Sequence, residues 1–131
     1  MRRGGLAWED SLKAPEAIGN SMFWNTLYAP QFDLISPSIS RQWARAWGGW
    51  AVGEWDCFFG ALLTSLEDAA QTNAGVRAIL SSQTDTGVVP NVASEGGISP
   101  DRSQPPVGSY AVWKVYQRCQ DRDLLGWAIH V

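Results

Sequence analysis

Two apolar patterns of helical period lie next to each other in residues 57–82. The first begins at Cys57, and its apolar residues recur three or four positions apart. Asp68 is a good N-cap for the second, with Gln71 three residues later as in a capping box. That helix is expected over residues 69–82, with Ala70, Ala74, Ile79 and Leu80 facing inward. Only Glu67 and Asp68 separate the two helices, which predicts a tight antiparallel αα-hairpin.

Helical patterns also lie on both sides of this hairpin. We expect a helix over residues 15–28, ended by Pro30, and another over residues 107–119. Asp121 or Asp123 would cap a last helix that contains Leu124 and Leu125. Residues 31–53 are expected to be irregular, with a short extended piece at residues 34–37. The sequence therefore predicts an all-α chain of four or five helices.

Residues 84–106 carry no regular pattern and contain four prolines. Structureless loops longer than about 12–15 residues are uncommon in compact domains and are usually functional or disordered. No charge run or repeat favours disorder here. We interpret the segment as a functional loop.

Composition excludes several classes of protein. The 131 residues suffice for one domain, and a net charge of −3 argues against a nucleic-acid surface. No apolar run approaches the roughly 18–20 residues that span a membrane. Glu9 and Asp10 follow Arg2-Arg3 too closely for a signal peptide, so the cytoplasm is the default location.

The two cysteines and the single histidine do not form a zinc-binding pattern. Cys57 and Cys119 lie far apart, and His130 is the only imidazole. The cysteines are either two buried thiols or a disulfide. We expect no metal and no cofactor.

Tryptophan is unusually frequent, with eight residues in the chain. Its indole N–H needs a hydrogen-bond partner when it is buried, so full burial of many tryptophans is costly. This density predicts either a thick aromatic core or a cleft lined by indole faces.

The Trp55-Asp56 pair has two interpretations. In the first, Asp56 is the N-cap of the helix that begins at Cys57, and Trp55 is a core residue. In the second, an indole face and a carboxylate lie together at the mouth of a helix. A sugar ring requires that combination, since its apolar face stacks on the indole and its hydroxyls donate to the carboxylate.

The segment from Asp101 to Pro106 also has two interpretations. Asp101 and Arg102 are either a surface ion pair of little energetic value or part of a polar site. In the site, Arg102 and Gln104 would donate hydrogen bonds to hydroxyl oxygens while the prolines fix their presentation.

Five motifs in order carry a family resemblance: Ser40-Arg41-Gln42-Trp43, Gly48-Gly49-Trp50, Glu54-Trp55-Asp56-Cys57-Phe58-Phe59, Val89-Pro90-Asn91 and Asp101-Arg102-Ser103-Gln104-Pro105-Pro106-Val107-Gly108. Together they resemble the front part of the catalytic domain of mannosylglycerate hydrolase-like enzymes. These are six-hairpin glycosidases of glycoside hydrolase family 63, related to trehalases. The resemblance covers the chain from about Ser21 onward.

The resemblance implies that residues 1–131 form a single partial (α/α)6 toroid, with residues 84–106 as the substrate-side loop. It implies a sugar subsite for the non-reducing end of a terminal α-linked glucose or mannose. The subsite residues would be Trp55, Asp56, Asn91, Arg102 and Gln104, with Trp50, Arg41 and Phe59 as neighbours.

In this family the general acid and the general base lie further along the domain than the matched region. We therefore expect no catalytic residue in this chain, which alone would be inactive. The expected ligand is an oligosaccharide or small glycoside, with no nucleic acid and no membrane as partner. Exposed apolar helix faces would favour self-association.

Two rival hypotheses remain. The chain is alternatively a non-catalytic helical module that binds sugars or a protein through its tryptophans. A third hypothesis is an enzyme that uses only carboxylates of this chain, drawn from Glu54, Asp56, Glu95 and Asp101.

Overall fold

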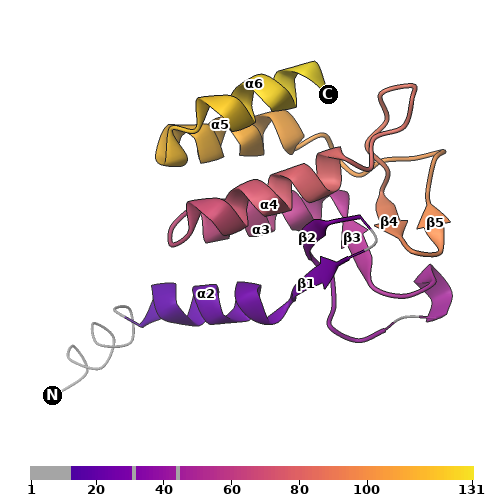
Figure 1. The fold of residues 1–131 in the computed structure, drawn as a ribbon, viewed down its shortest axis with the longest axis horizontal. Coiled ribbons are helices and arrows are strands. Elements are labelled where there is room, and N and C mark those ends of the chain that lie inside the picture. Colours follow the sequence, from indigo (N-terminus) through magenta and orange to yellow (C-terminus); the bar gives the residue numbers. More distant parts are fainter. Residues whose placement is uncertain (1–12, 31, 44) are drawn as a thin grey trace, which may run out of the picture.

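A computed structural model describes residues 13–30, 32–43 and 45–131. Within these residues the five α-helices lie in layers, as Figure 1 shows. They are α2 (Ala14–Trp24), α3 (Glu54–Thr64), α4 (Ala69–Leu80), α5 (Gly108–Cys119) and α6 (Arg122–His130). Helices α3 and α4 form the predicted hairpin in the middle. Helices α5 and α6 form a second pair on one side of it, and α2 packs against α3 on the other.

Two small antiparallel sheets lie at one end of the helical layers (Figure 1). Strand β1 (Thr26–Ala29) pairs with β2 (Leu34–Pro37) in the register Thr26↔Pro37 to Ala29↔Leu34. The second sheet has the order β3-β4-β5, formed by β3 (Ala51–Gly53), β4 (Val92–Ser94) and β5 (Gly97–Ile98). A short 3-10 helix, η1 (Arg45–Trp47), precedes β3.

These strands correct the expected fold class. The chain is not all-α and is not a partial (α/α)6 toroid, because its described part is a mixture of five helices and two sheets. Residues 26–28, expected as the end of the helix over residues 15–28, belong instead to β1. The segment 84–106 contains the β4-β5 hairpin, so it is not without regular structure. The extended piece at residues 34–37 is confirmed as β2.

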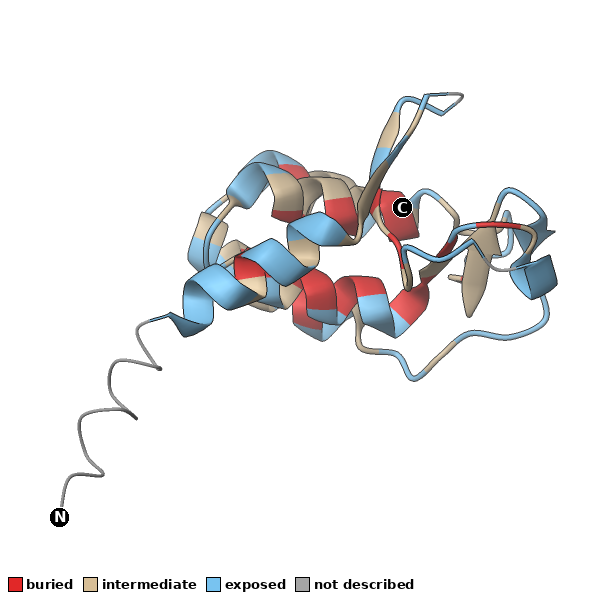
Figure 2. Cartoon of the chain, turned by 90° about the horizontal axis from the view of Figure 1, so that it is seen from below, coloured by how far each residue is buried: buried red, intermediate tan, exposed pale blue. Residues whose placement is uncertain are grey.

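The core lies where α3, α4, α5 and α6 meet. Figure 2 shows buried positions on these helices, interspersed with exposed ones. The largest fully buried apolar side chains of the cluster are Phe58, Ile79, Leu124, Val76 and Val115. The inward face of α4 is only partly as expected, since Ile79 is buried but Ala70 is exposed.

Two predicted helix caps are confirmed. The Asp68 carboxylate accepts a hydrogen bond from the Gln71 N–H at 2.9 Å, although the Gln71 side chain donates to Thr26 instead of closing the box. Of the two alternatives for the last helix, Asp121 is the cap, because its carboxylate accepts from the Leu124 N–H at 2.8 Å. Asp121 also accepts from the Asn73 amide at 2.5 Å, which joins α6 to α4.

Both cysteines are free thiols. Cys57 is buried and Cys119 is half-buried, so the expectation of two buried thiols holds fully only for Cys57. Burial raises the pKa of Cys57 to about 12.

The N-terminal residues on which the signal-peptide prediction rests lie outside the described residues. In the part of the chain that is described, no helix has the length and apolar character needed to cross a membrane.

The Asp121 cap can be tested with a pair of substitutions. Asp121→Ala should lower the free energy of unfolding by about 0.5–2 kcal/mol, because the Leu124 N–H loses its acceptor. Asp121→Asn keeps an acceptor oxygen for the Leu124 N–H and should lower the free energy of unfolding by less than Asp121→Ala does. The measurement is urea denaturation at neutral pH, and equal losses in the two variants would contradict the cap.

The same carboxylate predicts a pH dependence. The N–H of Leu124 is the main cause of the lowered pKa of Asp121. The contribution of the Asp121 carboxylate to stability is therefore present above its unfolded-state pKa. It is lost as the pH falls through its lower folded-state pKa. The stability difference between wild type and Asp121→Ala should shrink in acid.

Two glycines test the packing of α5 and α6. A Cβ at Gly108 would lie 2.9 Å from Phe58 Cζ, so Gly108→Ala should destabilise the fold by about 1–3 kcal/mol through overpacking. A Cβ at Gly126 meets nothing within 4 Å, so Gly126→Ala should stabilise it by about 0.5–1 kcal/mol through helix propensity. Thermal unfolding of both variants checks this. A Gly108→Ala variant as stable as the wild type would show that Phe58 does not fill the space beside Gly108, and a destabilised Gly126→Ala variant would show that the space beside Gly126 is not open.

Candidate functional site

The candidate site is built on the junction where β3 runs directly into α3. Gly53 ends the strand and is the N-cap of the helix, in an extended conformation. A Cβ at Gly53 would lie 2.5 Å from Asp56 Oδ2 and 2.8 Å from Ile39 Cδ1. A side chain at position 53 would therefore displace the Asp56 carboxylate and the end of the Ile39 side chain from their present positions.

Three hydrogen bonds tie this junction to distant parts of the chain, and a fourth joins two of those parts to each other. The Glu54 N–H donates to the Asn91 carbonyl at 3.2 Å, and the Asn91 N–H donates to the Arg102 carbonyl at 3.0 Å. The Gln104 N–H donates to Glu54 Oε2, and the Trp55 N–H donates to Gln104 Oε1 at 2.5 Å. The motifs around residues 55, 91, 102 and 104 are therefore brought together.

Trp55, Asp56 and Phe59 are exposed on the first turns of α3. The indole of Trp55 is 39% exposed, and its ring centroid lies 6.4 Å from that of Phe59. No described residue donates a hydrogen bond to the Asp56 side chain. The interpretation of Asp56 as the N-cap and Trp55 as a core residue is thus wrong, because Gly53 is the cap and the indole is open to solvent.

Arg102 and Asp101 form an ion pair at 3.0 Å, with both side chains well exposed. The ion pair of the first interpretation is therefore present, and it leaves open whether Arg102 also belongs to a polar site. An exposed pair of this kind adds little to stability, so the guanidinium can exchange its partner at low cost.

Arg41 and Trp50 belong to a different cluster. The Trp50 indole donates to the Arg41 carbonyl at 2.9 Å, while the Arg41 guanidinium donates to the Trp24 carbonyl at 2.6 Å and lies 4.4 Å from its ring centroid. Trp50 lines a hollow of about 620 Å³ that also includes Tyr28 and Phe32. Among the described residues, no hydrogen bond or ring contact joins this cluster to Trp55 or Asp56.

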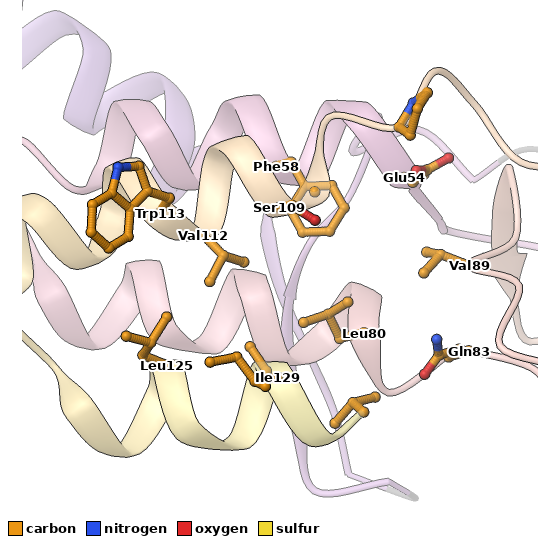
Figure 3. Close-up of a pocket in the computed structure, with 14 residues that line it drawn as sticks. Glu54, Phe58, Leu80, Gln83, Val89, Ser109, Val112, Trp113, Leu125 and Ile129 are labelled. Carbon is orange, nitrogen blue, oxygen red and sulfur yellow. The ribbon is translucent and has the colours of Figure 1, made fainter.

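Glu54 was not among the predicted subsite residues. The sequence indicated it only as one of four carboxylates that a catalytic pair could use. It is 4% exposed, and burial raises its pKa, although the hydrogen bond from Gln104 opposes that shift. In the sequence it stands before the helix that is expected to begin at Cys57, and its neighbours gave no sign that it would be buried; in the structure it is the first residue of α3. Figure 3 shows it at the edge of an apolar cavity between the helices.

Comparisons with protein-family models, curated proteins and solved structures gave no match for this chain. What it binds has to be inferred from the site itself.

The hydrogen bond from Trp55 to Gln104 can be tested directly. Gln104→Ala removes the acceptor of the Trp55 N–H and should lower the free energy of unfolding by about 1 kcal/mol. Amide exchange at Trp55 should accelerate with it. Gln42→Ala, at an exposed position, is the matched control. Unchanged exchange at Trp55 would mean that another group holds this amide.

Proposed function

We propose that the surface at the start of α3 binds one hexose unit, and that this chain carries a sugar subsite of a glycoside hydrolase acting on terminal α-linked glucose or mannose. The observation that supports it most is the convergence of residues 55, 91, 102 and 104 through hydrogen bonds between segments about 10 to 50 residues apart in sequence. These are the same positions for which the family resemblance implies a shared subsite.

The exposed groups have the chemistry of a sugar site. The apolar face of a pyranose ring stacks on the indole of Trp55, which offers a flat surface next to Phe59. The Asp56 carboxylate has two acceptor oxygens, which suits two neighbouring hydroxyls. Asp56 is the third residue of α3, and the dipole of the helix stabilises a negatively charged side chain near the N-terminus.

The polar wall opposite this pair would come from residues 91–104. The guanidinium of Arg102 provides several N–H donors, and the Asn91 amide provides donors and an acceptor. The side-chain oxygen of Gln104, Oε1, already accepts a hydrogen bond from the Trp55 N–H, so of this side-chain amide only the NH2 group remains for a ligand. Gln104 therefore both orders the helix start and offers a donor.

In this proposal Asp56 binds hydroxyls and is not the general acid. An inverting hydrolase needs a carboxylic acid and a carboxylate about 6.5–9.5 Å apart, with a water between the second group and the sugar. The resemblance implies that this pair lies beyond the matched region. The subsite would position the sugar, and the pair would carry out the chemistry.

The test is an NMR titration of the 131-residue chain with methyl α-D-glucopyranoside and methyl α-D-mannopyranoside. We expect saturable shifts of the Trp55 indole N–H signal with at least one of them. Asp56→Asn should weaken this binding about tenfold, because hydrogen bonds to a charged acceptor are worth about 1.5–3 kcal/mol. Trp55→Ala should remove it.

Matched controls are Asp85→Asn and Trp47→Ala, which change an exposed acid and an exposed indole elsewhere. Both should bind the glycosides as the wild type does. Binding that survives Trp55→Ala, or the absence of binding by a folded chain, would refute the subsite. Turnover of a p-nitrophenyl α-glycoside that is lost in Asp56→Asn would instead make Asp56 catalytic.

A further inference from the structure

A second cavity lies between α3, α4, α5 and α6, away from the exposed face of Trp55. Its volume is about 520 Å³, within the range of small-molecule sites. Figure 3 shows its apolar walls converging from all four helices. The apolar walls include Phe58, Leu80, Val112, Trp113, Leu125 and Ile129.

The cavity has one polar end. In Figure 3 the side chains of Glu54, Gln83 and Val89 lie at one end, and those of Trp113 and Leu125 lie at the other. Glu54 is 4% exposed, and its Oε2 accepts from the Gln104 N–H. Its Oε1 accepts no hydrogen bond from any described residue.

This carboxylate lacks a counter-charge. The described residues that line the cavity include no Lys, Arg or His. Taking a carboxylate out of water is costly unless a cation and hydrogen-bond donors compensate it. The hydrogen bond from the Gln104 N–H gives Glu54 Oε2 a donor but does not neutralise the carboxylate. Oε1 is therefore available to a ligand.

We propose that this cavity binds a small aliphatic amine, with its ammonium group on Glu54 and its hydrocarbon chain along the apolar walls. The ammonium provides both the positive charge and the donors that Glu54 lacks. Contact with Leu80, Val112 and Ile129 removes the hydrocarbon from water. The charge of Glu54 selects a cationic head group over a neutral or anionic one.

The probe is n-octylammonium, titrated at neutral pH into the full chain and followed by two-dimensional amide NMR, with n-octanol and octanoate as comparison ligands. We expect octylammonium to bind about tenfold more tightly than octanol, and octanoate not to bind. The shifts should concentrate on residues of α5 and α6 that line the cavity. This ranking on the wild type requires no variant.

Two variants separate the head group from the tail. Glu54→Gln keeps an acceptor for the Gln104 N–H but removes the charge, so it should abolish the preference for octylammonium and leave octanol binding unchanged. Ser109→Phe places a ring in the cavity from an exposed position and should remove binding of both ligands. The matched controls are Glu67→Gln and Gln117→Phe, which change an exposed acid and an exposed residue of α5 outside the cavity.

Three results would overturn the proposal: equal affinity for octanol and octylammonium, a preference that persists in Glu54→Gln, or no binding to a chain whose thermal unfolding is cooperative. Binding that is lost as protein concentration rises, with dimers in sedimentation, would show that a second copy covers the cavity. Glycoside binding at Trp55 is measured separately, so failure of either proposal leaves the other testable.

Discussion

The start of α3 is the constraint on which the rest of the site depends. A helix leaves its first N–H groups without partners, and here Gly53 has no side chain to supply one. The backbone carbonyl of Asn91 and the side-chain oxygen of Gln104 accept from these N–H groups from across the chain. The segment 84–106 is therefore anchored at two points to the helix whose first turn presents Trp55 and Asp56. Its conformation and the presentation of these two side chains are set by the same hydrogen bonds.

Much of the helical part could be predicted from sequence because its signals are local. The cap at Asp68, the cap at Asp121 and the short hairpin connection each depend on residues within one turn. The strands could not be predicted in this way. Strands β3 and β4 are three residues long and pair across about 40 residues of chain, so neither shows a readable alternation. Thr26–Ala29 follows α2 after a single residue, and only its pairing with β2 makes it a strand.

The candidate site shows the same division. Residues 55, 56 and 59 are neighbours on one helix, so their proximity follows from local spacing, whereas the exposure of Trp55 does not. The approach of residues 91, 102 and 104 depends on long-range hydrogen bonds, and motif order suggested it without fixing its geometry. The burial of Glu54 was not predictable, since an acid in the first turn of a helix is ordinarily a solvated residue. Its carboxylate accepts a hydrogen bond from the Gln104 N–H and borders a cavity that α5 also lines, and neither Gln104 nor α5 is near it in sequence.

Two successive hydrogen bonds through Gln104 connect Glu54, at the edge of the cavity, with Trp55, at the proposed sugar site. Gln104 donates its N–H to Glu54 at the edge of the cavity and accepts from Trp55 below the exposed face. The raised pKa of Glu54 means that its stabilising contribution is fully present below its unfolded-state pKa and lost as pH rises through the folded-state value. Asp121 has the opposite sign, so acid weakens the α6 cap while it relieves the buried charge. A cation on Glu54 would relieve that charge at neutral pH, and the gain would reach the start of α3 through Gln104.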